Sequence, residues 1–150
     1  DDSSLRPNQI MAVSLRFPVL EQEFWKPVVD VVEAKLLTPL GLRTLDQADR
    51  RYHGHYEGSL WDRDAAYHQG LVWTWLIGPF FDAYKKIYNE PEKVKGLLQA
   101  FEPHLQQAGV GTISEIFDGD DPFMPRACIA QAWSVAEVLR CFMDGVKDAK

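Results

Sequence analysis

The stretch LVWTWLIGPFFDAYKKIY, residues 71–88, decides how this chain folds. Apolar residues occupy nearly every position around this segment, and no continuous polar face interrupts them. A helix with such a pattern has no side to turn toward water, so other elements must enclose it. The sequence therefore predicts a buried central helix over residues 71–88, with the rest of the fold packed around it.

Four other segments show helical periodicity, and we expect helices over residues 7–17, 24–37, 91–108 and 127–146. The last of these places Ile129, Ala132, Trp133, Ala136, Leu139 and Met143 on one stripe. An all-round apolar helix beside one-faced helices is typical of concentric helical layers. The sequence therefore predicts an all-α fold of about five helices, with long irregular loops at 38–68 and 109–126 gathered at one mouth.

Composition and charge restrict the class of protein. The chain has 150 residues, of which 46% are hydrophobic and 25% charged, as expected for one globular domain. Acidic residues outnumber basic ones by 22 to 16, so neither nucleic acid nor an anionic membrane is an expected partner. No apolar run approaches the roughly 20 residues that span a bilayer, and no signal segment opens the chain. We therefore expect a cytoplasmic protein.

The two cysteines are not expected to form a disulfide. If Cys128 and Cys141 lie on one helix, its rise separates them by roughly 20 Å, whereas a disulfide needs Cα atoms within about 7 Å. We expect both to be buried apolar residues. The five Trp, five Tyr and eight Phe residues suit either core packing or the stacking of sugar rings, and composition does not choose between these.

Glu115 is the sharpest candidate for chemistry, because it lies between apolar residues in the string GTISEIFDG, residues 111–119. A carboxylate enclosed by apolar neighbours is partly desolvated, and the resulting rise in basicity suits a general base that activates water. A helix-capping or surface glutamate would produce the same local sequence. The residues alone leave both interpretations open.

Asp64, His68 and Gln69 lead directly into the predicted central helix. Their side chains could exchange hydrogen bonds with sugar hydroxyls, or they could cap the N-terminus of that helix, which needs the same residue types. His53 and His55 form only a weak metal signal, because no third ligand stands at a recognisable spacing. We expect no metal site and no cofactor, since phosphate-loop, nucleophile-elbow and Cys-x-x-Cys motifs are absent from the sequence.

Several strings, taken together and in order, resemble the glucosidase (amylo-α-1,6-glucosidase) domain of glycogen debranching enzymes. They are 5–9, 37–45, 52–54, 56–58, 63–70, 72–73, 78–80, 114–119 and 125–137. The resemblance covers nearly the whole chain. It departs from the expected pattern at Leu71 and Thr74, where we expect Thr and Pro, and at Ala127, where we expect Gly.

The resemblance implies that residues 1–150 are a single partial domain, the C-terminal portion of a six-hairpin α/α toroid. It implies an inverting hydrolase of α-1,6 branch linkages in glycogen or related branched α-glucans, with Glu115 as the general base. The general acid would lie upstream of this chain. The residues that would line the sugar site are Arg6, Asn8, Asp64, His68, Gln69 and Trp73.

The same resemblance makes the missing N-terminal part of the domain an expected partner, and the isolated chain is expected to be inactive. Two alternatives stay open. One is a non-catalytic helical module that binds glucan or is completed by a partner chain, including a homo-oligomer formed through exposed apolar helices. The other is a different glycosidase of the same toroid fold.

Overall fold

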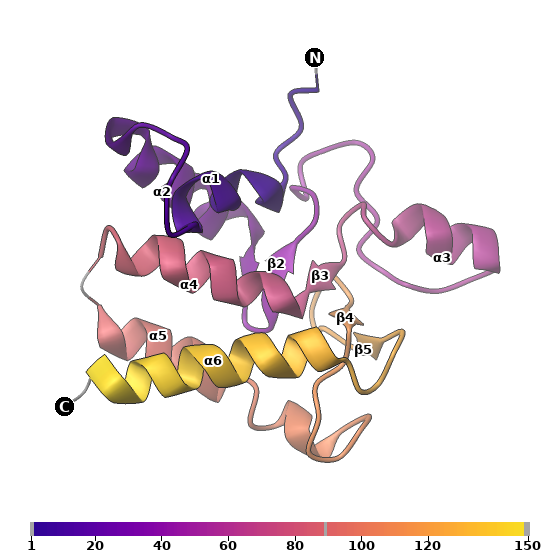
Figure 1. Cartoon of the computed structure of the whole chain (residues 1–150). Coiled ribbons are helices and arrows are strands. Elements are labelled where there is room, and N and C mark those ends of the chain that lie inside the picture. The colour runs from indigo at the N-terminus through magenta and orange to yellow at the C-terminus, as the bar shows by residue number, and fades with distance from the viewer. Residues whose placement is uncertain (1, 89, 149–150) are drawn as a thin grey trace.

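The computed structural model describes residues 2–88 and 90–148. The α-helices are α1 (Met11–Ser14), α2 (Trp25–Leu36), α3 (Leu60–Ala66), α4 (Ile77–Lys85), α5 (Pro91–Gln99) and α6 (Ala132–Asp148). Short 3-10 helices are η1 (Pro7–Ile10), η2 (Gln22–Phe24), η3 (Thr74–Leu76) and η4 (His104–Gln106). The strands are β1 (Leu37–Thr38), β2 (Gly41–Arg43), β3 (Val72–Trp73), β4 (Ile116–Phe117) and β5 (Pro125–Arg126). In Figure 1 the helices other than α3 pack together, and the sheet lies between them and α3.

Helix α4 is the centre of the helical part, as predicted. It contacts α1, α2 and α6, and these neighbours enclose it from several sides. Four of its large side chains, Ile77, Phe80, Phe81 and Tyr84, are buried in the hydrophobic core. The all-round apolar pattern is therefore explained by enclosure.

Prolines shorten two of the predicted helices. Pro79 lacks an N–H and its ring would clash with the carbonyl four residues earlier, so a helix can begin only shortly before it. The predicted helix 71–88 accordingly starts at Ile77, and residues 71–76 form β3 and η3 instead. Pro103 has the same effect on the predicted helix 91–108, because α5 ends at Gln99 and η4 follows.

A five-stranded antiparallel sheet in the order β1-β2-β3-β4-β5 corrects the prediction of an all-α fold. Leu42 pairs with Trp73, and Trp73 pairs with Ile116. These segments are buried, so their backbone N–H and C=O groups must find partners away from water. Strands of two or three residues are too short to show the alternation by which a sequence reveals a strand.

Strand β1 ends at the first residue of the segment 38–68 that was predicted to be irregular, strand β2 lies inside that segment, and so does helix α3. Its start is specified by a capping box, in which the Ser59 side chain accepts from the Asp62 N–H and Asp62 accepts from the Ser59 N–H. The sequence of this helix has no apolar stripe at helical spacing. Its two large apolar residues, Leu60 and Trp61, are adjacent in the sequence and both are exposed.

The predicted apolar stripe of the fifth helix faces solvent in this chain. Helix α6 begins at Ala132, because β5 and the left-handed Ala127 at φ 55° precede it. Ser134 and Cys141 on α6 face the core. The exposed side of the segment carries Ile129, Ala132, Trp133, Ala136, Leu139, Phe142 and Met143. None of the helices that the structure describes has the length and hydropathy needed to cross a bilayer.

Cys128 and Cys141 are both free thiols in different surroundings. Cys141 lies on α6 and is buried, whereas Cys128 precedes that helix and is exposed, which corrects the prediction that both are buried on one helix. Burial raises the pKa of the Cys141 thiol to about 12, so this thiol stays protonated near neutral pH.

We expect a thiol reagent such as dithionitrobenzoate to modify one cysteine of the folded chain at neutral pH. Cys141 should react at least about tenfold more slowly than Cys128, because it is both inaccessible and protonated. Unfolding in guanidinium should release the second equivalent. Cys128→Ser serves as the control and should remove the fast phase. Two fast thiols in the folded chain would mean that α6 does not pack on α4 and α5.

Candidate functional site

Glu115 lies directly before β4, and its backbone is held on both sides. Its N–H donates to the Cys128 carbonyl at 2.9 Å, and the next two residues pair with β3 and β5. Because Glu115 is half-buried and does not stand at a helix end, the capping alternative is wrong. The sheet therefore supports this side chain from the backbone.

The carboxylate of Glu115 accepts hydrogen bonds from three residues that lie far away in the sequence. The Tyr67 hydroxyl donates to Oε1 at 2.8 Å, and Gln131 Nε2 donates to the same oxygen at 3.3 Å. The Cys128 N–H approaches Oε2 at 3.4 Å. A carboxylate held by three donors from two separate segments has a defined orientation, which distinguishes it from a free surface glutamate.

Aromatic rings form a wall beside this carboxylate. The Tyr67 ring meets Trp73 edge-on at a centroid distance of 4.9 Å, and His68 stacks on Trp73 at 4.9 Å with only 16° between the ring planes. Trp133 extends the wall, because it meets Trp73 at 5.8 Å and stacks on Trp75 at 5.7 Å. Stacked rings beside a carboxylate provide both a flat apolar surface and a polar group for a ligand.

Tyr67 stays in its neutral form in this environment. Burial raises the pKa of its hydroxyl, and the hydrogen bond to Glu115 and the charge of that carboxylate raise it further above the ordinary value. A neutral phenol can donate a hydrogen bond, whereas a phenolate cannot. The hydroxyl therefore acts as a donor to Glu115 at any physiological pH.

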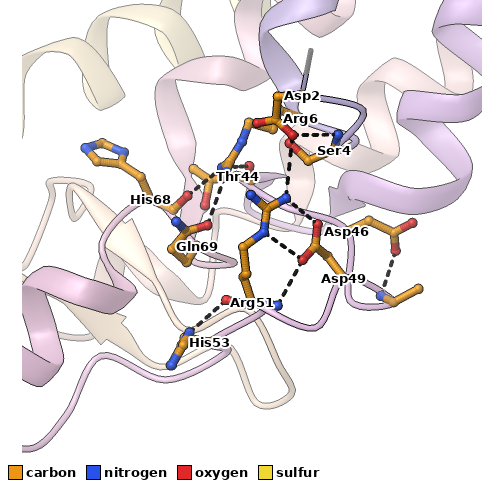
Figure 2. Close-up of polar contacts among 11 residues, drawn as sticks. Asp2, Ser4, Arg6, Thr44, Asp46, Asp49, Arg51, His53, His68 and Gln69 are labelled. Carbon is orange, nitrogen blue, oxygen red and sulfur yellow. Dashed lines mark hydrogen bonds and ion pairs between the residues drawn. The ribbon is translucent and has the colours of Figure 1, made fainter.

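Arg6 and Gln69, both predicted to line the sugar site, bind each other (Figure 2). The Arg6 guanidinium donates to Gln69 Oε1 at 2.9 Å, to the His68 carbonyl at 2.8 Å and to the Thr44 carbonyl at 3.1 Å. The His68 ring points away from Arg6 in this view. That ring stacks on Trp73 instead. Arg6 thus fixes the turn that presents His68.

Asn8 and Asp64 are exposed, on η1 and α3 respectively. In the part of the chain that the structure describes, neither side chain takes part in the hydrogen bonds around Glu115. The structure therefore joins His68 and Trp73 to Glu115 through Tyr67, and joins Arg6 to Gln69, but it does not bring Asn8 or Asp64 into this group.

The alternative that Asp64, His68 and Gln69 cap the central helix is wrong. β3 and η3 separate these residues from α4, and Leu76, which stands at the α4 N-cap, makes no side-chain capping bond. Leu71, which stands where the resemblance leads us to expect Thr, has a fully buried side chain in the hydrophobic core. It therefore packs against core neighbours.

Comparison with known proteins assigns the family. The family model described as amylo-alpha-1,6-glucosidase matches residues 1–140. The chain belongs to the amylo-alpha-1,6-glucosidase family. It is also 32% identical over 167 aligned residues to the glycogen debranching enzyme of Saccharomyces cerevisiae (strain ATCC 204508 / S288c). That alignment covers 96% of the chain but only 11% of the yeast protein. The resemblance predicted from the sequence is therefore confirmed.

One departure of this glucosidase-family chain has a structural explanation. Ala127, where the resemblance leads us to expect Gly, has φ 55°, in the left-handed region that Gly adopts without strain. It lies immediately before Cys128, whose backbone bonds Glu115 from both its N–H and its carbonyl. The turn at residue 127 thus delivers the backbone groups that hold Glu115.

A second carboxylate, Asp118, anchors the other end of β4 in this chain of the glucosidase family. Arg126 on β5 donates to its two oxygens at 2.9 and 2.7 Å, and the Tyr56 N–H donates at 3.0 Å. Burial alone raises the pKa of Asp118, but these hydrogen bonds and the Arg126 charge outweigh burial and hold the pKa below its usual value. Asp118 therefore ties the segment around Tyr56 to the sheet.

His104 supports the residue before Glu115. The Ser114 N–H donates to His104 Nε2 at 3.1 Å, so Nε2 must be the unprotonated nitrogen of the ring. Burial lowers the pKa of His104, which keeps the neutral form that this bond needs. The His104 ring also meets Phe117 edge-on at 4.6 Å, which joins it to β4.

His53 and His55 do not form a shared site. His53 Nδ1 faces the Arg51 carbonyl at 2.8 Å, whereas His55 lies 3.4 Å from Asp118. Across residues 2–88 and 90–148, no group of three or more His, Cys, Asp or Glu side chains is arranged to hold a metal ion.

Sequence reasoning missed Tyr67, Gln131 and Trp133 as members of the site. Gln131 and Trp133 stand within the family-like string 125–137, which was the available signal, but nothing local relates them to Glu115. Tyr67 lies between two predicted site residues, Asp64 and His68, yet its hydroxyl partner is 48 residues away. Only the folded chain shows that contact.

Proposed function

We propose that this chain supplies the general base and one wall of the sugar site of an α-1,6-glucosidase that acts on glycogen or related branched α-glucans. The observation that carries the proposal is the Glu115 carboxylate, held by Tyr67 and Gln131 beside the His68 and Trp73 rings in a chain of this family. An oriented carboxylate activates water, and aromatic rings stack on the apolar face of a glucose unit.

The proposed reaction is a single displacement with inversion. Glu115 takes a proton from a water molecule while the water oxygen forms a bond to the anomeric carbon of the branch glucose. The bond between that carbon and O6 of the main chain breaks, and O6 receives a proton from a carboxylic acid. The products are free glucose of inverted configuration and the debranched glucan.

The carboxylic acid would come from the rest of a debranching enzyme, since the chain spans 11% of the length of its yeast relative. Inverting glycosidases hold their two carboxyl groups roughly 6.5–9.5 Å apart, which leaves room for the water between them. We propose that the remaining helices complete an α/α toroid that places this acid opposite Glu115.

The exposed apolar side of α6 supports the partner-completed arrangement. Trp133, Leu139, Phe142 and Met143 are each about half exposed, which is unusual for four large apolar side chains on one helix. We propose that the remainder of the domain covers this side. The second candidate is a non-catalytic module in which another copy of the chain covers it, and sedimentation of the isolated chain tests that candidate.

We expect the isolated chain to release no glucose from a maltooligosaccharide that carries a single α-1,6-linked glucose. It lacks the proton donor, so protonation of the leaving O6 is not catalysed. A chimera of the yeast enzyme, in which this chain replaces the matching segment, should release glucose, and NMR should detect the β-anomer first. Turnover by the isolated chain would show that the acid lies within it. A folded but inactive chimera would contradict the proposed function.

A further inference from the structure

The two oxygens of the Glu115 carboxylate are not equivalent. Oε1 accepts from the Tyr67 hydroxyl at 2.8 Å and from Gln131 Nε2 at 3.3 Å, so both of its lone-pair directions have donors. Among the residues that the structure describes, Oε2 has one donor, the Cys128 N–H at 3.4 Å, which is longer than an ordinary N–H···O hydrogen bond. Oε2 therefore retains the capacity to accept a proton from a further donor.

The Tyr67 hydroxyl is aimed by its surroundings. Tyr67 follows α3 directly, and the start of that helix is held by the Ser59–Asp62 capping box. Its carbonyl accepts from Trp73 Nε1 at 3.0 Å, which binds Tyr67 to β3. Its ring lies among Tyr56, His68 and Trp73, with centroid distances of 5.8, 4.9 and 4.9 Å. Contacts other than the bond to Glu115 therefore fix the position of the Tyr67 ring.

Gln131 plays a weaker part in this arrangement. Its Nε2 is 3.3 Å from Oε1, and its own side-chain oxygen accepts from the Ala132 N–H at 3.0 Å at the start of α6. The amide therefore divides its contacts between Glu115 and the helix terminus. The short bond from Tyr67 is the one that determines how the carboxylate is rotated.

We propose that Tyr67 is the positioning residue of the base: its hydroxyl occupies Oε1 of Glu115 and leaves Oε2 as the oxygen that takes the proton from the attacking water. This inference rests on the proposed function of Glu115. Tyr67 does not touch the reacting atoms, and it acts by holding one oxygen so that the other faces the water.

The first test compares two Tyr→Phe substitutions in the yeast chimera. Tyr67→Phe keeps the ring and removes the bond to Glu115. Tyr84→Phe is the matched control, because Tyr84 donates the same kind of bond to Glu90 at 2.7 Å, away from the site. Tyr67→Phe should lower kcat by about 10- to 100-fold while KM changes less than about threefold. Tyr84→Phe should change neither value by more than about twofold. Equal effects of the two substitutions would overturn the proposal.

The second test uses the chain alone and does not depend on activity. With 13Cζ-labelled tyrosine, Glu115→Gln should shift the Tyr67 resonance at neutral pH and leave the Tyr84 resonance in place. An unmoved Tyr67 resonance would show that the two side chains do not bond in solution, which overturns the inference. If Tyr67 shifts but Glu115→Gln leaves the chimera fully active, the base role fails instead, so the two failures are distinguishable.

Discussion

Glu115→Gln in the yeast chimera is expected to lower kcat for release of the branch glucose by about 10²- to 10⁴-fold, with little change in KM. Glutamine has nearly the same shape and can still accept the hydrogen bond from Tyr67, but it cannot take a proton from water. The loss should therefore fall on the chemical step and leave glucan binding and the fold intact. Initial rates of glucose release on a singly branched maltooligosaccharide measure it.

The control for this substitution is Glu90→Gln, since Glu90 also accepts a hydrogen bond from a tyrosine, Tyr84. That variant should keep the activity of the unsubstituted chimera to within about twofold. A Glu115→Gln enzyme that retains more than a tenth of the original kcat would rule out Glu115 as the base.

Asp118→Asn is expected to lower the free energy of unfolding of the chain by about 2–3 kcal/mol. The Asp118 side chain is only 3% exposed and accepts two bonds from Arg126, so the amide would place a buried N–H group against the Arg126 guanidinium, which is itself a donor. Urea unfolding followed by tryptophan fluorescence measures the difference.

Asp82→Asn is the matched control for Asp118→Asn. Asp82 also accepts two bonds from one arginine, Arg140, but its side chain is 39% exposed. Water can replace the lost bonds at such a position, so the expected loss is below about 1 kcal/mol. Equal losses at the two positions would mean that burial of Asp118 does not matter to stability.

The stability that Asp118 provides should depend on pH in a defined direction. Its pKa is lower in the folded chain than in the unfolded chain, so folding favours the ionised form. The contribution is present above the ordinary aspartate pKa of about 3.9 and is lost as the pH falls through the lower pKa of the folded state. The difference between the original chain and Asp118→Asn should therefore shrink in acid.

The Asp118 ion pair also concerns the site, because only β4 separates Asp118 from Glu115. The carboxylate at one end of this two-residue strand binds β5 and the Tyr56 segment, and the one at the other end binds Tyr67 and Gln131. The anchored strand gives Glu115 a rigid backbone, which a base needs if its carboxylate is to keep one orientation.

The sequence by itself determined the features whose cause is local. The pattern at 71–88 predicted that α4 is enclosed, because helical periodicity depends on residues three and four apart. Pro79 and Pro103 would have corrected the lengths of two predicted helices, since each acts on a carbonyl only four residues away. The strings that resemble the family likewise identified the family, because they too are read within short segments, whereas the role of Glu115 stays a prediction.

Only the tertiary structure decided the features that depend on distant partners. Strands β2, β3 and β4 exist because buried backbone groups about 30 to 45 residues apart bond one another, and strands of two or three residues leave no pattern in the sequence. The apolar stripe of α6 predicted a helix, but not that this stripe would be the exposed side. The bond from Tyr67 to Glu115 joins residues 48 positions apart, and a contact of that range is set by packing of whole elements rather than by neighbouring residues.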